Sequence, residues 1–259
     1  MQNELKIALI QSDLVWENPE QNKVHFSKKI ESISDVVDVI ILPEMFTSGF
    51  TMNASEVAET MFGETVVWMQ EIALKKQTAI LGSMVISENN LFFNRLLFVH
   101  PNGKIETYDK KHTFTLAGED RVYTGGQDKL NVTYRGWKIC PLICYDLRFP
   151  VWARNVEGYD LLIYVANWPK VRVNAWDALL KARAIENMSY CVGVNRVGQD
   201  GNNHEYSGHS AVYNVLGDKL DNIPENQEAI EIVTLSKLHI KTYRDKLGFL
   251  NDKDTFKLE

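Results

Sequence analysis

Short apolar runs recur along the chain, and several of them stop abruptly at polar residues. In residues 36–42, for example, only Asp38 interrupts the apolar run before Pro43 and Glu44. Continuous runs of this kind are typical of strands covered on both faces in α/β architectures. The pattern predicts strands over residues 5–10, 36–42, 79–86, 91–99, 104–108, 130–134, 137–143, 160–166, 191–195, 210–215 and 229–233.

Between these runs, apolar residues recur at intervals of three and four, which is the spacing of one helix face. This spacing predicts helices over residues 18–33, 64–77, 174–190 and 236–246. Asn174 is expected to cap the start of the third helix. Arg183 and Glu186, three residues apart, are expected to pair along it.

Two kinds of connection join the predicted strands. Residues 101–103 read Pro-Asn-Gly, a turn that should fold strands 91–99 and 104–108 into a hairpin. Elsewhere strands alternate with helices, and the mixture predicts an α/β fold of two sheets covered by helices. We see no linker, repeat or low-complexity segment, so residues 1–259 are expected to form a single domain.

Composition narrows the possible function classes. The chain has 259 residues, a net charge of −6 and no basic run, which argues against nucleic-acid binding. No apolar run approaches the ~20 residues of a membrane span, and the N-terminus does not resemble a signal peptide. Three cysteines without paired spacing fit a reducing compartment. The lack of a CxxC or HxxH pair argues against a structural zinc site.

The most informative stretch is residues 139–150, where an apolar run ends in Cys144 and polar residues, an arginine and a proline follow. Local rules predict a buried strand, a sharp turn and the start of a helix. A cysteine at such a turn would project its sulfur from the sheet edge, beside N–H groups that can receive an oxyanion. Cys144 is therefore a candidate nucleophile. The alternative is a core cysteine, the usual case for an intracellular thiol.

Other candidates also lie where strands end. Glu44 follows a buried strand, where α/β folds place their chemistry, although most loop glutamates are simply solvated. Lys110 and Lys111 follow another strand beside His112, and spacing alone does not decide which of them turns inward. The glycine-containing stretch 117–126 could cradle a ligand, but its polarity favours a plain surface loop.

Three segments occur together in the order and spacing of the nitrilase (carbon–nitrogen hydrolase) superfamily. They are residues 42–46 (LPEMF), 109–114 (DKKHTF) and 143–150 (ICYDLRFP). The resemblance extends from the first strand through Asn187. It implies a four-layer α-β-β-α sandwich and a Glu-Lys-Cys triad with a second glutamate nearby. Thr113 departs from the leucine that usually follows the family's histidine, a change that affects packing more than chemistry.

Carried onto this sequence, the resemblance assigns four catalytic residues. The base is Glu44, after Leu-Pro, and the nucleophile is Cys144. The lysine is Lys110, because the family's lysine stands two residues before the histidine. The second glutamate corresponds to Glu119. The resemblance implies no metal and no organic cofactor.

Within the superfamily, residues 43–50 (PEMFTSGF) and 164–169 (YVANWP) most resemble the bacterial ω-amidases. This implies hydrolysis of the terminal amide of small 2-oxo acid amides, α-ketoglutaramate or α-ketosuccinamate, to the 2-oxo dicarboxylate and ammonia. The same triad would also serve deaminated glutathione, another small amide, a carbamoyl compound or a nitrile. A non-catalytic scaffold is disfavoured because all four catalytic residues are present.

Substrate contacts are expected from residues in loops at strand ends. A distal carboxylate needs a cation or backbone donors, and Arg148 lies close to Cys144 in sequence; a structural ion pair is its alternative role. By analogy with relatives we expect a homodimer, and the thiol content suggests a cytoplasmic enzyme acting on a small-molecule amide. The expected substrate-binding residues are Tyr145, Arg148, Trp168, Phe46 and Tyr123.

Overall fold

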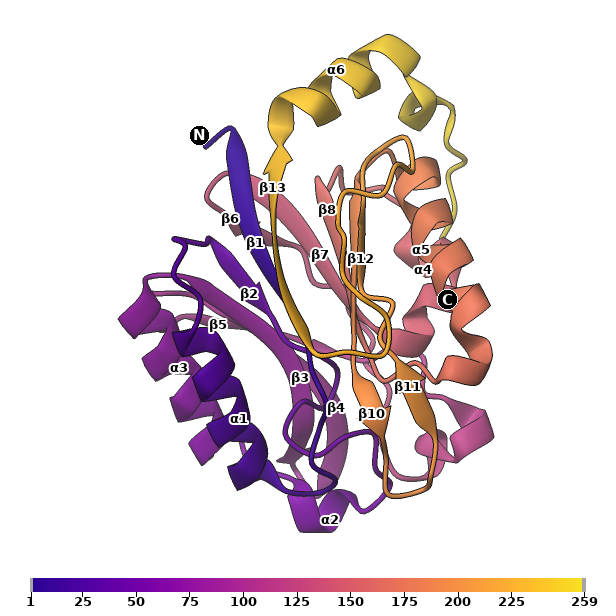
Figure 1. Ribbon diagram of the computed structural model, residues 1–259. Coiled ribbons are helices and arrows are strands. Elements are labelled where there is room, and N and C mark those ends of the chain that lie inside the picture. Colours follow the sequence, from indigo (N-terminus) through magenta and orange to yellow (C-terminus); the bar gives the residue numbers. More distant parts are fainter. Residues whose placement is uncertain (1, 258–259) are drawn as a thin grey trace.

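A computed structural model describes residues 2–257 of the protein. Its strands form two large sheets and one small hairpin, and helices cover the outer face of each large sheet (Figure 1). This is the predicted α-β-β-α sandwich.

The first sheet has the strand order β13-β1-β2-β3-β4-β5. Strands β1, β2 and β3 run parallel, whereas β4 and β5 form the predicted hairpin. Consequently β2 and β5 both end at the edge of the sheet that faces the site. The strands are β1 (Glu4–Gln11), β2 (Val39–Ile41), β3 (Ala79–Glu88), β4 (Leu91–Val99), β5 (Ile105–Asp109) and β13 (Ala229–Ser236).

The second sheet has the order β12-β9-β8-β7-β6, with β7, β8 and β9 parallel. A separate two-stranded hairpin, β10-β11, extends beyond it. The strands are β6 (Val132–Tyr134), β7 (Trp137–Ile143), β8 (Leu161–Ala166), β9 (Tyr190–Asn195), β10 (Val197–Gln199), β11 (Glu205–Ser207) and β12 (Ala211–Tyr213).

Two apolar cores hold the layers together. Phe26 and Met69, from two outer helices, pack on the first sheet with Ile40 and Ile80. The larger core lies between the two sheets and continues under α5 through Trp176. The α-helices are α1 (Pro19–Glu31), α2 (Ala54–Val57), α3 (Glu64–Lys76), α4 (Pro150–Ala153), α5 (Val173–Asn187) and α6 (Lys237–Leu247), and the 3-10 helices are Thr115–Ala117, Glu119–Arg121, Cys144–Arg148, Lys170–Arg172 and Phe249–Asp252. None of the helices within residues 2–257 is both long and apolar enough to cross a membrane.

The structure corrects two local predictions. Helix α5 begins at Val173 with Arg172 as its N-cap residue, so Asn174 is inside the helix, and Met188 ends it in a left-handed conformation (φ 44°). Residues 196–206, where the sequence predicts neither strand nor helix, contain the β10-β11 hairpin. The predicted pair along α5 is confirmed, with Arg183 Nη1 2.8 Å from Glu186 Oε1.

Candidate active site

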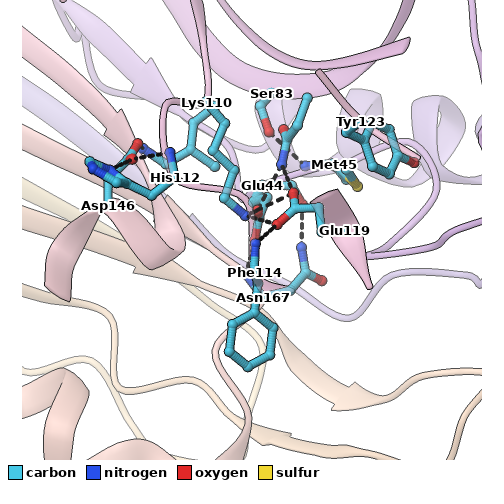
Figure 2. A network of polar contacts seen from close by, with 12 residues as sticks. Glu44, Met45, Ser83, Lys110, His112, Phe114, Glu119, Tyr123, Asp146 and Asn167 are labelled. Atoms are coloured by element: carbon cyan, nitrogen blue, oxygen red, sulfur yellow. Dashed lines mark hydrogen bonds and ion pairs between the residues drawn. The ribbon is translucent and has the colours of Figure 1, made fainter. Parts of the chain in front are cut away.

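Glu44 lies just beyond the carboxyl end of β2 and is fully buried. The next residue, Met45, takes a positive φ of 42°, which turns the chain sharply after the strand. The Met45 N–H donates to Ser83 Oγ on β3 at 2.9 Å, so the neighbouring strand fixes this turn (Figure 2). The local backbone thus directs the Glu44 carboxylate inward.

Lys110 follows β5 and reaches between two buried carboxylates (Figure 2). Its Nζ donates to Glu44 Oε1 at 2.9 Å and to the two oxygens of Glu119 at 3.0 and 2.9 Å. The Lys110 side chain is 1% exposed and both carboxylates are 0% exposed. Lys111, by contrast, faces outward and donates to Gln127 at 2.9 Å. The structure therefore separates the two lysines that spacing alone left equivalent, and it places inward the one that the family resemblance selected, Lys110.

Two asparagines complete the environment of Glu44. Asn94, in the middle of β4, donates from Nδ2 to Glu44 Oε1 at 2.8 Å and approaches Glu119 Oε1 at 3.5 Å. Asn167, just after β8, donates its backbone N–H to Glu44 Oε2 at 2.8 Å and its side-chain amide to the Glu44 carbonyl at 2.6 Å. Donors thus fix both oxygens of the Glu44 carboxylate in place.

Glu119 is held in an equally specific way. It opens a 3-10 helix and accepts the Phe114 N–H at 2.5 Å as well as the Lys110 ammonium. The interpretation of residues 117–126 as a plain surface loop is therefore wrong at Glu119, which is fully buried.

Cys144 occupies the junction between β7 and a 3-10 helix, as the sequence predicted for a sharp turn. Its φ is +43°, a left-handed conformation that costs a non-glycine residue roughly 1–3 kcal/mol. Such strain persists only where the surrounding structure imposes it. Cys144 is 9% exposed and lines a cavity.

Asp146 imposes this turn. Its carboxylate accepts the Ile143 N–H at 3.1 Å and the Tyr108 hydroxyl at 2.7 Å. It also accepts the His112 N–H at 3.0 Å, and His112 Nδ1 lies 2.8 Å away. One buried carboxylate thus ties the turn that carries Cys144 to the segment that carries Lys110.

The charges of the site shift the proton affinities of its members. Burial alone would lower the pKa of Lys110, but Glu119 and Glu44 hold it above its ordinary value. Burial raises the pKa of the Cys144 thiol well above its ordinary value; Glu44 raises it further and Lys110 opposes the shift. Burial also raises the pKa of Glu119, against the opposing charge of Lys110. Lys110 is therefore a cation, and Cys144 rests as a thiol.

A cavity of about 470 Å³ opens above Cys144 and Lys110. Small-molecule sites typically measure ~300–1,000 Å³, so this cavity suits a small metabolite. Its walls include Trp16, Phe50, Thr51, Met52, Asn53, Phe114, Leu116, Ala117, Tyr145, Arg148, Asn167, Trp168, Pro169, Arg172, Asp200, Asn202, His204 and Tyr206.

Three of the five expected substrate-binding residues line this cavity, namely Tyr145, Arg148 and Trp168. Phe46 does not: it is fully buried in the core between the first sheet and its helices, with its ring 5.6 Å from that of Phe26. Tyr123 lies behind the wall and donates its hydroxyl to the Thr51 carbonyl at 2.7 Å. Both expectations are corrected, because an aromatic near a strand end can fill the core as readily as a pocket.

Three further residues of the site, Asn94, Asn167 and Asp146, were not predicted from the sequence. Asn94 carries a weak signal, since it interrupts the apolar strand 91–99. Asn167 follows β8 just as Glu44 follows β2 and Cys144 follows β7, a recurrence that could have marked it. Within residues 2–257 there is no cluster of three or more His, Cys, Asp or Glu side chains suited to a metal ion.

Comparison with known proteins agrees with this geometry. Residues 6–245 match the family described as carbon-nitrogen hydrolase. "Omega-amidase YafV" of Escherichia coli (strain K12) is 45% identical over 255 residues, 98% of each chain. "2-oxoglutaramate amidase" of Bacillus subtilis (strain 168) is 32% identical and covers 82% of this chain and 83% of its own.

Among solved structures, XC1258 from Xanthomonas campestris superposes with a TM-score of 0.97, at 40% identity and full coverage of both chains. It is described as a CN-hydrolase superfamily protein with an arsenic adduct in the active site. The predicted resemblance, including its ω-amidase branch, is confirmed, and the chain belongs to the carbon–nitrogen hydrolase (nitrilase) superfamily.

Proposed function

We propose that the protein is an ω-amidase, a cysteine amidohydrolase that converts α-ketoglutaramate or α-ketosuccinamate to the 2-oxo dicarboxylate and ammonia. The observation that carries the proposal is the buried Lys110, held between Glu44 and Glu119 at a cavity that also exposes Cys144. The similarity to proteins named ω-amidase and 2-oxoglutaramate amidase supports the substrate class.

Acylation begins with proton transfer, because Cys144 rests as a thiol and only the thiolate is strongly nucleophilic. The Glu44 carboxylate takes the Sγ proton as sulfur attacks the amide carbon. The C–S bond forms, and the carbonyl electron pair moves to oxygen. When the tetrahedral intermediate collapses, the C–N bond breaks and protonated Glu44 gives its proton to the nitrogen, which departs as ammonia.

The oxyanion is received by the Lys110 ammonium and the backbone N–H of Tyr145. Tyr145 is the second residue of the 3-10 helix Cys144–Arg148, and the first N–H groups of a helix have no intrahelical acceptor. Loss of one such donor typically costs ~3–4 kcal/mol. In this scheme the left-handed turn at Cys144 serves to place the sulfur and the following N–H on the same side.

Hydrolysis of the thioester uses the same groups in reverse. Glu44 takes a proton from water, the hydroxide attacks the acyl carbon, and the C–S bond breaks. The proton on Glu44 returns to sulfur and the carboxylic acid leaves. Glu119 keeps Lys110 charged and fixed throughout, and Asn94 and Asn167 hold Glu44 at the geometry that both half-reactions need.

Arg148 is the proposed partner of the distal carboxylate. It lines the cavity, and its guanidinium lies 4.9 Å from the centre of the Trp168 ring, which fixes its plane. A planar guanidinium can bind a carboxylate through two parallel hydrogen bonds. The wall formed by Tyr145 and Trp168 would pack against the short carbon chain.

Three wider features belong to the same proposal. Residues 1–259 form one carbon–nitrogen hydrolase domain, since the family match covers residues 6–245. We propose that the enzyme acts as a homodimer. It works in the cytoplasm, where Cys140, Cys144 and Cys191, all free here, would stay reduced.

Steady-state ammonia release tests the proposal with α-ketoglutaramate, deaminated glutathione and glutamine as substrates. We expect α-ketoglutaramate to be turned over far faster than the other two, and only by protein with an intact Cys144. Faster turnover of deaminated glutathione would overturn the substrate class but keep the chemistry. Inactivity on all three, with a Cys144 that resists thiol reagents, would overturn the enzyme itself.

A further inference from the structure

The wall of the cavity carries an unusual balance of charge. Besides Lys110, its basic side chains are Arg148, Arg172 and His204, and its single carboxylate is Asp200. The whole chain, in contrast, carries a net charge of −6. Basic side chains therefore outnumber acidic ones in the wall of this cavity, although the protein as a whole is acidic.

Arg148 and Arg172 differ in their partners from five of the other arginines; within residues 2–257, Arg121 and Arg154 also lack an ion pair, but neither lines the cavity. Across the part of the chain that the structure describes, no carboxylate oxygen lies within 4.0 Å of either guanidinium. Each lies instead against an aromatic ring of the cavity, Arg148 4.9 Å from Trp168 and Arg172 5.2 Å from Phe114. Five others each form an ion pair with a carboxylate: Arg95, Arg135, Arg183, Arg196 and Arg244.

The two guanidinium groups belong to one continuous wall. Trp168, beneath Arg148, donates its Nε1–H to the Arg172 carbonyl at 2.8 Å. Phe114, beneath Arg172, lies 4.9 Å from the ring of Tyr145, the residue after Cys144. Stacking fixes the planes of both guanidiniums while their N–H groups stay unpaired with any acid, an arrangement that favours binding of an anion.

Asp200, the one carboxylate of the wall, is already occupied. It accepts the N–H groups of Asn202 and His204 at 2.8 and 2.9 Å and the Tyr206 hydroxyl at 2.8 Å. His204 Nδ1 lies 3.2 Å from it as well. These donors keep the pKa of Asp200 below its ordinary value even though burial raises it. A substrate ammonium group would find no free carboxylate here.

We propose that Arg172 forms a two-guanidinium clamp with Arg148, and that this clamp restricts the enzyme to amides whose far end is anionic and lacks an amino group. The inference rests on the proposed amidase function and specifies its substrate class. An α-carboxylate beside a 2-oxo group is accepted. The same carboxylate beside an α-ammonium, as in glutamine, is rejected because the ammonium meets two cations and no free acid.

The size of the effect follows from repulsion between like charges. A substrate ammonium beside unpaired cations is strongly disfavoured, most of all where solvent is excluded. Arg148 is exposed and Arg172 half-buried, so solvent weakens this repulsion. We expect kcat/KM for α-ketoglutaramate to exceed that for glutamine by roughly 10³-fold.

The test compares Arg172→Gln with wild type on three amides: α-ketoglutaramate, glutamine and uncharged pentanamide. For the variant we expect KM for α-ketoglutaramate to rise about 10- to 30-fold with kcat within about threefold, and the activity on pentanamide to stay unchanged, since one charge-assisted contact is lost. Arg172→Lys should recover part of the loss. Lys170→Gln is the matched control, because it removes a positive charge from the same 3-10 helix but from a side chain paired with Glu205.

Separate outcomes overturn the clamp and the proposed function. If Arg172→Gln leaves KM for α-ketoglutaramate unchanged, or weakens α-ketoglutaramate and pentanamide equally, the clamp is wrong while the amidase remains. An equal loss in Lys170→Gln would also contradict it, because the effect would then be one of general charge. Wild-type protein that releases no ammonia from α-ketoglutaramate but hydrolyses pentanamide would refute the proposed substrate instead.

Discussion

Two groups of charged side chains face the same cavity and are built in opposite ways. At its floor, Lys110 is surrounded by Glu44 and Glu119, and every one of these groups is buried and paired. At its mouth, Arg148 and Arg172 stack on aromatic rings and pair with no carboxylate of residues 2–257. The charged groups at the floor are already paired with one another, whereas the guanidinium groups at the mouth remain available to a ligand.

The difference follows from what each region has to do. A buried ion cluster is costly to assemble, and removing one partner leaves an uncompensated charge that costs ~3–5 kcal/mol. Such a cluster is rigid, which suits groups that must meet a transition state. Exposed cations cost little to leave unpaired and can exchange water for a substrate. We therefore expect changes at the floor to lower kcat and changes at the mouth to raise KM.

The largest effect is expected at the nucleophile. Cys144→Ala should lower kcat for α-ketoglutaramate by roughly 10⁴-fold or more, because no thioester can form. Ammonia release measured at saturating substrate checks this. Cys140→Ala is the control, since that thiol lies four residues earlier, within β7, is fully buried and should be dispensable for turnover. Comparable inactivation by Cys140→Ala would show that the losses reflect misfolding.

A smaller loss is expected at the second glutamate. Glu119→Gln keeps the shape of the side chain but removes one of the two negative charges around Lys110. We expect kcat to fall about 10²- to 10³-fold with KM changed little, because the oxyanion donor is no longer held in place. Glu106→Gln on β5 should behave as wild type. A change in KM alone would show that Glu119 acts in substrate binding, as proposed for the arginines, and would contradict the difference drawn between floor and mouth.

Asn94 tests whether a residue outside the Glu-Lys-Cys triad belongs to the buried catalytic cluster at the floor. In Asn94→Leu, Glu44 loses the N–H donor that fixes its Oε1, so the carboxylate should be less well oriented for proton transfer. We expect kcat at neutral pH to fall about tenfold with KM changed little. Steady-state kcat and KM are measured beside the midpoint of thermal unfolding. A fall in kcat that accompanies a large fall in that midpoint would assign Asn94 a packing role only.

At the mouth, Arg148→Gln should raise KM for α-ketoglutaramate about tenfold and leave kcat nearly unchanged, because the lost contact is made equally in the ground state and the transition state. The exposed Arg121, which does not line the cavity, offers a matched control in Arg121→Gln. If Arg148→Gln instead lowers kcat at constant KM, Arg148 contributes to the chemical step and not to substrate binding.

The smallest effect is expected at a surface cluster that serves as a baseline. Glu228 contacts His25 and Lys29, its side chain is 38% exposed, and its pKa falls from 4.5 to about 2, as the hydrogen bond from His25 and other donors outweigh burial. A lowered carboxyl pKa stabilises the fold above pH 4.5 and loses that contribution as pH falls towards 2.

Glu228→Gln should therefore reduce the free energy of unfolding by less than about 1 kcal/mol at pH 7, since solvent screens the pair. Denaturant titrations at several pH values check this. The difference from wild type should shrink between pH 4.5 and 2. A difference that instead grows towards acid pH would contradict the sign of the shift.

Much of the fold could be predicted from local pattern. Apolar runs identified the strands, and their abrupt ends marked Glu44 and Cys144, because a buried strand must stop where the chain turns towards solvent or a site. Prediction was weaker where burial depended on distant partners. Phe46 follows β2 as Glu44 does, yet it belongs to the helix-covered core, and the sequence offers no means of telling the two environments apart.

The sequence by itself determined the strand-and-helix alternation, the superfamily and the four catalytic residues of the proposed site, since these depend on local periodicity and on motifs of a few residues. Only the tertiary structure decided that Asn94 donates a hydrogen bond to Glu44. It also placed Arg172 against the ring of Phe114, with its carbonyl hydrogen-bonded to Trp168, the ring against which Arg148 lies. The pairing of Lys110 with Glu44 spans 66 residues and joins the ends of two strands. No local rule fixes such a pair, because its geometry depends on how the strands are ordered in the sheet.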